Sequence, residues 1–107
     1  MARIVVVSDA AGSDLDELYG FIARQDTAAR AQRVVTQIEQ VIQSPATSPE
    51  RGVFPPELAA MATREYREVF FKRYRIVYKV LPREVLGLLV ADGRRDIKTL
   101  LLSRLLA

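Results

Sequence analysis

Positively charged side chains recur in the stretch YREVFFKRYRIVYKV, residues 66–80, which contains three arginines and two lysines. From residue 74 the residue types alternate, with Tyr74, Ile76, Tyr78 and Val80 on one side and Arg75, Val77 and Lys79 on the other. This alternation predicts a strand with one buried face and one mainly cationic face. Two explanations are open for the cationic face: it blocks pairing with other strands, or it binds an acidic partner.

We expect a basic functional surface that consists of Arg67, Arg75, Lys79, Arg94, Arg95 and Lys98. The offsets of Arg67 and Arg75 from the turn at 72–73 allow both to lie on one face, and Arg94 and Arg95 follow the next strand. A guanidinium donates two parallel hydrogen bonds to phosphate, and Tyr74 or Tyr78 could stack on a base. Composition and spacing leave two alternatives open, contact with nucleic acid and a solvated basic face.

The chain has no cysteine and no histidine, which excludes disulfides, thiolate metal sites and the usual hydrolase triads. The acidic residues Asp14, Asp16 and Glu17 could be taken for a metal site. We favour a different interpretation, in which they occupy the first turn of a helix and stabilise its N-terminus. No catalytic residue, metal or cofactor is expected.

The charges are divided unevenly along the chain. Residues 1–63 contain five Lys or Arg and eight Asp or Glu, whereas residues 64–107 contain eleven and five. This asymmetry indicates an acidic partner for the C-terminal half, either nucleic acid or an acidic protein segment. The apolar runs at the N-terminus and at 85–91 are too short for a signal peptide or a membrane span, so we expect a cytoplasmic protein that does not enter a membrane.

Hydrophobic periodicity predicts two helices after a short strand at 3–8. The first helix starts at Asp14 with Ser13 as its N-cap, because Leu15, Leu18, Tyr19 and Ile22 form one apolar stripe. The second is capped by Asp26 or Thr27 and ends near Ser44. A proline-rich connection then leads to three strands, at about 65–71, 74–81 and 84–91, and to a short terminal helix capped by Asp96.

These elements predict an α+β fold in the order β-α-α-β-β-β-α, as one domain over residues 1–107. The tight spacing of the last three strands predicts hairpins and hence a mainly antiparallel sheet. We expect the strand at 84–91 to be central, because it is apolar on both faces. The helical hairpin and the terminal helix are expected on one face of this sheet.

The C-terminal helix contains more leucines than one buried face can accommodate. Ile97, Leu100, Leu101 and Leu105 form one face, which leaves Leu102 and Leu106 turned partly away from it. Exposed apolar side chains of this kind can mark a partner site. Packing within the core or between two copies of the chain is an equally good explanation.

Over nearly its whole length the chain resembles the RelE/ParE superfamily of toxins from bacterial type II toxin–antitoxin systems, and more closely the ParE (plasmid-stabilisation) branch. The stretches that carry the resemblance are DLDELYGFIA, RAQRVVTQIEQVI, SPERGVFPPEL, YREVFFKRYRIVYKV and VADGRRDIKTLLLSRL. The superfamily has the same order of elements. The resemblance implies a cognate antitoxin, ParD-like or similar, in a hetero-oligomeric complex, with Leu102 and Leu106 as candidate antitoxin contacts.

The two branches of this superfamily imply different targets. In the RNA-cleaving RelE branch, arginines at the positions of Arg75 and Arg95 bind mRNA phosphate on the ribosome. Here Val69 and Leu101 stand where that branch has a lysine and a tyrosine, so no proton-transfer pair is evident. The resemblance therefore favours a ParE-like poison of DNA gyrase that is not an enzyme and meets nucleic acid through its target. The alternatives are a ribosome-dependent mRNA interferase and a non-toxic interaction module.

Overall fold

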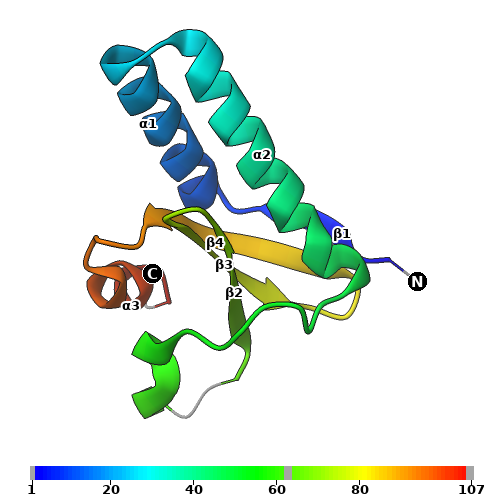
Figure 1. Cartoon of the computed structure of the whole chain (residues 1–107). Helices are drawn as coiled ribbons and strands as arrows, with labels where there is room; N and C mark the ends of the chain where they lie inside the picture. Colours follow the sequence, from blue (N-terminus) through cyan, green and yellow to red (C-terminus); the bar gives the residue numbers. More distant parts are fainter. Residues whose placement is uncertain (1, 62–63, 106–107) are drawn as a thin grey trace.

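The computed structural model describes residues 2–61 and 64–105 and confirms the predicted α+β class and element order. Figure 1 shows the elements, which are β1 (Ile4–Val7), α1 (Asp9–Gln25), α2 (Ala28–Thr47), β2 (Tyr66–Phe71), β3 (Tyr74–Val80), β4 (Glu84–Asp92) and α3 (Ile97–Leu105). A short 3₁₀ helix, η1 (Pro56–Met61), lies within the proline-rich connection, where the sequence predicted only irregular structure.

The four strands form one sheet in the order β1-β4-β3-β2, and β4 is central as predicted. Strand β3 is antiparallel to both β2 and β4, and β1 pairs with β4 in parallel. Val77 pairs with Leu89 while Tyr78 pairs with Gly87, so Leu88 is an extra residue that forms a bulge in β4. The sheet is therefore mainly antiparallel, as expected.

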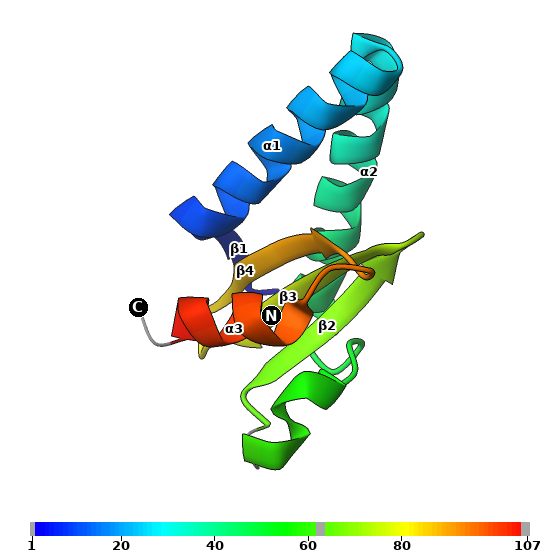
Figure 2. The same cartoon turned by 90° about the vertical axis from the view of Figure 1, so that its left-hand side faces the viewer.

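Helices cover both faces of the sheet, and the prediction that all helices lie on one face is wrong. Figures 1 and 2 show the α1–α2 hairpin on one side of the sheet and α3 with η1 on the other. Each side has its own core. The core under the hairpin includes Ile38, Ile76 and Val85, and the core under α3 includes Val77, Leu89 and Leu101. The β3 face predicted to be cationic is thus largely covered.

Helix α1 begins five residues earlier than the sequence predicted. Its N-cap is Ser8, not Ser13, and the Ser8 hydroxyl accepts a hydrogen bond from the Ala11 N–H at 3.1 Å. Asp14 consequently lies beyond the first turn and is free for another role. None of the described helices is both long and apolar enough to cross a bilayer.

Helix α2 is capped by Thr27, one of the two residues predicted for this role, and runs past Ser44 to Thr47. Pro45 lies inside the helix, and it has no N–H to donate to the carbonyl of Val41. The Ser44 hydroxyl donates to that carbonyl instead, at 2.7 Å. This substitute hydrogen bond explains why the helix continues where the proline predicted an end.

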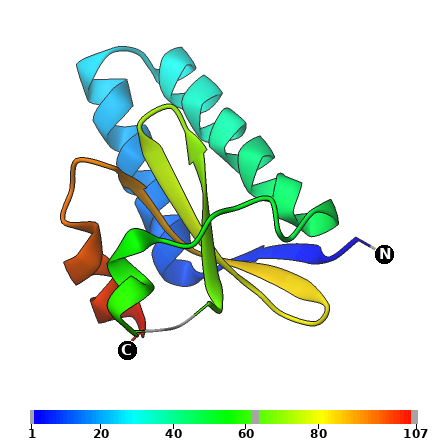
Figure 3. The same ribbon diagram turned by 60° about the horizontal axis from the view of Figure 1, so that its bottom comes forward.

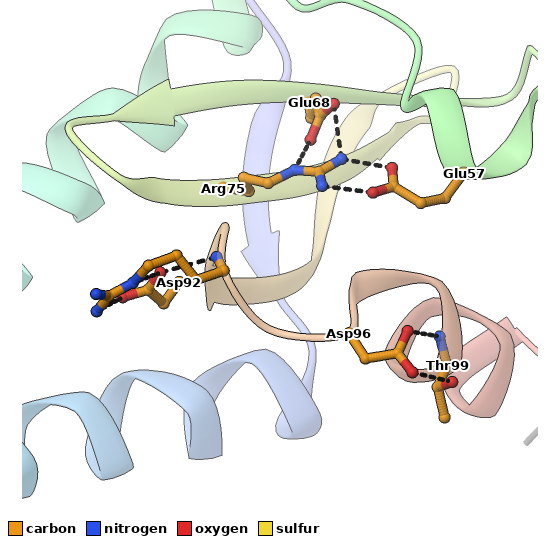
Figure 4. A network of polar contacts seen from close by, with 7 residues as sticks. Glu57, Glu68, Arg75, Asp92, Asp96 and Thr99 are labelled. Atoms are coloured by element: carbon orange, nitrogen blue, oxygen red, sulfur yellow. Dashed lines mark hydrogen bonds and ion pairs between the residues drawn. The ribbon is translucent and has the colours of Figure 1, made fainter.

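Helix α3 has the predicted cap. The Asp96 carboxylate accepts hydrogen bonds from the Thr99 N–H at 3.1 Å and from the Thr99 hydroxyl at 2.7 Å (Figure 4). These bonds hold the pKa of Asp96 below its ordinary value. The carboxylate is therefore occupied as a helix cap and is directed at its own helix.

Candidate functional site

The two strand arginines, Arg67 and Arg75, lie on opposite faces of the sheet. Arg67 pairs with Tyr78 and Arg75 pairs with Phe70, so on β2 the paired positions are three residues apart. Side chains alternate along a strand, and an odd offset places them on opposite faces. The prediction that one face could hold both arginines is wrong.

Arg67 holds the proline-rich connection against β2. Its guanidinium donates to the Gly52 carbonyl at 2.9 Å and lies 4.4 Å from the centre of the Phe54 ring. The buried Tyr78 hydroxyl accepts from the Gly52 N–H at 3.0 Å and donates to the Pro49 carbonyl at 2.9 Å. Tyr78 and Tyr74 are both buried in the core under the hairpin, so neither is available to stack on a base.

Arg75 is held between two carboxylates, as Figure 4 shows. Its Nε and Nη2 donate to Glu68 at 2.6 and 3.0 Å, and its Nη1 and Nη2 donate to Glu57 at 2.6 Å each. Four of the five guanidinium N–H donors are thus in use. The side chains of Arg75 and Glu68 are only 12% and 2% exposed.

The pairing shifts the pKa values of Arg75 and Glu57. Hydrogen bonds to Glu57 raise the pKa of Arg75 above its ordinary value, and the Arg75 guanidinium lowers the pKa of Glu57. Glu57 belongs to η1 and Glu68 to β2, so Arg75 ties the connection to the sheet. We call Glu57, Glu68 and Arg75 the arginine clamp. It is a structural element, with almost no donor left for a phosphate.

Lys79 is separated from the other predicted cations. It lies toward the end of β3 that pairs with Leu86, whereas Tyr74, at the start of β3, pairs with Asp92 beside Arg94. Its ammonium lies 5.6 Å from the centre of the Tyr66 ring. The six residues predicted as one basic surface therefore divide into three strand positions and the group at 94–98.

A second group of cations gathers where the β2–β3 turn meets the β4–α3 loop. The Gly93 N–H donates to the Arg73 carbonyl at 2.8 Å, which joins the two loops directly. We call the five cations of these loops and of the first turn of α3 the basic end: Lys72, Arg73, Arg94, Arg95 and Lys98. Sequence reasoning treated 72–73 only as a turn, although the predicted meander already placed that turn beside the end of β4.

Asp92 lies between two arginines of the basic end. It forms salt bridges with Arg73 at 2.9 Å and with Arg94 at 3.0 Å, and the hydrogen bonds from Arg94 lower its pKa. Lys72, Arg95 and Lys98 form no salt bridge within residues 2–61 and 64–105. These three side chains are exposed to solvent.

A groove of about 630 Å³ opens beside the basic end, between α1 and the ends of β3 and β4. Its apolar lining consists of Leu18, Phe21, Tyr74, Val90 and Ala91, and its charged lining of Glu17, Arg73, Asp92, Arg94 and Arg95. An apolar floor with a mostly cationic rim suits an amphipathic segment that carries carboxylates. Phe21 is 50% exposed in this groove.

Asp14 joins three elements of the fold. Its carboxylate accepts hydrogen bonds from the Val90 N–H at 2.9 Å and from both terminal nitrogens of Arg104, and Arg104 also donates to the Leu88 carbonyl at 2.9 Å. Because α1 starts at Asp9, the interpretation of Asp14, Asp16 and Glu17 as first-turn residues of this helix is wrong. Within the described ranges, no group of three or more potential metal ligands is present.

The predicted antitoxin contacts fall at the end of α3. Leu102 is half-buried, and Leu106 lies outside the described residues. Their role as contacts stays a prediction.

A solved structure shares this fold. It is described as the chromosomal ParDE toxin–antitoxin system of P. aeruginosa, and the match has a TM-score of 0.70 with 15% sequence identity, over 85% of this chain and 96% of the other. The match shows that the two chains share a fold. No curated protein sequence matches the chain significantly.

The sequence itself matches a family model over residues 5–97, and that model describes the ParE toxin of the parDE type II toxin–antitoxin system. The chain therefore belongs to the ParE toxin family. Membership implies an antitoxin as partner.

Proposed function

We propose that the chain inhibits growth by poisoning DNA gyrase in the cytoplasm, through binding and without catalysis, and that a cognate antitoxin neutralises it. The observation that carries this proposal is the placement of Val69 and Leu101, the two positions where the RNA-cleaving branch has a lysine and a tyrosine. Both are buried, Val69 under the hairpin and Leu101 under α3, on opposite faces of the sheet. Neither side chain can donate or accept a proton, so neither can take part in cleaving a phosphodiester.

The arginine clamp supports the same conclusion. Arg75 stands where the RNA-cleaving branch binds phosphate, and here four of its donors are engaged by Glu57 and Glu68. General acid–base catalysis contributes roughly 10²–10⁴-fold, and arginine stays protonated and accepts protons poorly. An mRNA interferase is thus poorly supported, and no observation favours a non-toxic interaction module over a toxin.

A purified gyrase reaction tests the target. With supercoiled plasmid and gyrase, the toxin should cause linear plasmid to accumulate, because a trapped cleavage complex leaves both strands broken. The same plasmid without gyrase is the control and should stay intact. A translating extract should show no new mRNA cuts. Cuts at the ribosomal A site, with supercoiling unaffected by excess toxin, would instead establish the interferase alternative.

We propose that the antitoxin covers the groove between α1 and the ends of β3 and β4. The apolar floor around Phe21 and Val90 would bury apolar side chains of an amphipathic segment, and Arg73, Arg94 and Arg95 would face its carboxylates. Leu102, on α3, is proposed as a second contact. An antitoxin in this groove would also screen the charge of the basic end.

A pair of variants on one helix tests the groove. Phe21→Glu should weaken antitoxin binding by roughly 2–4 kcal/mol, because it places a carboxylate on a desolvated hot spot. Tyr19→Glu is the matched control, since Tyr19 is 36% exposed on α1 and does not line the groove. Titration calorimetry with the antitoxin measures the affinity of both variants. Loss of affinity in Leu102→Asp but not in Phe21→Glu would move the antitoxin site to α3.

A further inference from the structure

The basic end concentrates the positive charge of the whole protein. Within the two loops and the first turn of α3, its five cations are accompanied by two carboxylates, Asp92 and Asp96, for a net charge of +3. Two carboxylates of the hairpin, Glu17 and Asp26, line the hollows beside them. The formal net charge of the chain is also +3, so the charges of all other residues sum to zero. The asymmetry along the sequence is thus concentrated in space at two adjoining loops, which lie side by side because the Gly93 N–H binds the Arg73 carbonyl.

Within the described residues, neither carboxylate forms a salt bridge with Lys72, Arg95 or Lys98. Asp92 is shared by Arg73 and Arg94, and Asp96 accepts both of its hydrogen bonds from Thr99 (Figure 4). Lys72, Arg95 and Lys98 consequently keep their charge exposed. Exposed cations raise the local concentration of anions and make association faster and dependent on salt.

The shape and composition of this surface distinguish between acidic partners. Figure 3 shows the β4–α3 loop at the margin of the fold. The β2–β3 turn lies beside the hairpin, where Lys72 and Arg73 line a hollow together with Phe21 of α1. Lys72, Arg95 and Lys98 come from these loops and the start of α3, and only Arg95 also lines the groove. An acidic peptide needs apolar anchors, which the groove supplies. A phosphodiester backbone needs only cations at intervals, which the outer three residues supply.

We propose that Lys72, Arg95 and Lys98 contact the phosphate backbone of the DNA that gyrase holds. This inference rests on the proposed gyrase poisoning and adds a direct toxin–DNA contact to it. The contact is sequence-independent, because it uses phosphate and no base-reading side chain. Arg73 and Arg94 lie on the rim of the antitoxin groove, so an antitoxin seated there would also compete with DNA for the basic end.

A triple variant tests the DNA contact. Lys72→Gln, Arg95→Gln and Lys98→Gln together bring the local net charge to zero without breaking a salt bridge. The toxin concentration needed for half-maximal plasmid cleavage by gyrase should rise by on the order of tenfold or more. The affinity of the toxin for the gyrase–DNA complex should also depend less on salt. The slope of the logarithm of this affinity against the logarithm of the salt concentration should become shallower by about 2–3, since each phosphate contact contributes about 0.9 to that slope. The control removes three other exposed cations, with Arg33→Gln, Arg51→Gln and Arg83→Gln, and should leave both quantities unchanged.

The outcomes separate this inference from the function on which it rests. If the triple variant cleaves plasmid with wild-type potency and salt slope, the basic end does not contact DNA and gyrase poisoning stands. If the triple variant poisons gyrase normally but loses antitoxin affinity, the basic end contacts the antitoxin and the inference is wrong. If the wild-type toxin causes no gyrase-dependent cleavage, both proposals are wrong.

Discussion

Replacement of Arg75 by methionine is expected to destabilise the fold by about 3–5 kcal/mol, because it removes one partner of a buried ion pair. Glu68 is 2% exposed and would be left buried with no guanidinium beside it. Glu57 would lose both of its hydrogen bonds from Arg75, and η1 its tie to the sheet. This expectation reverses what the sequence indicated, since a solvated strand arginine would change stability by less than about 0.5 kcal/mol.

Urea unfolding of three variants measures how much the arginine clamp contributes to the free energy of unfolding. The exposed Arg95→Met is the matched control and should stay within about 0.5 kcal/mol of wild type. Adding Glu68→Gln to Arg75→Met should recover part of the loss, because the stranded charge is removed along with its partner. If Arg75→Met unfolds at the same urea concentration as Arg95→Met, the clamp does not stabilise the fold.

The clamp also gives stability a defined dependence on pH. The folded-state pKa of Glu57 is lower than its ordinary value of 4.5. Its contribution is therefore fully present above pH 4.5 and is lost as the pH falls through the lowered pKa. The difference in stability between wild type and Arg75→Met should accordingly narrow in acid, and a difference that stays constant or widens there would contradict this assignment.

The strands β2, β3 and β4 and the helix α2 were predicted correctly, because short-range sequence patterns determine them. Period-two alternation and two tight turns define β2, β3 and β4 within a few residues, and one apolar stripe defines α2. The start of α1 was misplaced because Ser8 and Ser13 are both good N-caps, and the alanines after Ser8 add no periodic apolar signal. Both choices satisfy local rules, and only the packing of α1 on β4 decides between them.

The site depends on contacts between residues far apart in the sequence, which periodicity does not detect. Arg75 looks like a free cation within its own strand, and its partner Glu57 lies 18 residues away in a segment with no periodic pattern. The basic end has a similar origin, because a hydrogen bond between Gly93 and Arg73 joins two loops. The sequence therefore predicted the part of the basic end at 94–98, but it joined that part to the strand residues and left out Lys72 and Arg73.

Asp14→Ala is the second substitution with a large expected effect, about 2–4 kcal/mol of lost stability. It leaves the Val90 N–H without its acceptor, and it leaves Arg104, whose side chain is 19% exposed, with only the Leu88 carbonyl. Hydrogen bonds to Asp14 raise the pKa of Arg104 in the wild type. Arginine stays protonated even without them, so the variant cannot relieve the loss by releasing that proton.

The functional consequence follows from where Asp14 is attached. It fixes α1 beside Val90 of β4, and Leu18, one turn further along α1, lines the same groove as Val90. Asp14→Ala should therefore weaken antitoxin binding even at temperatures where the variant is fully folded. Asp16→Ala, on an exposed position of the same helix, is the control for both measurements and should change neither by more than about 0.5 kcal/mol. If Asp14→Ala loses stability but binds the antitoxin as tightly as the control, the attachment of α1 to β4 does not affect antitoxin binding, which would contradict a site in this groove.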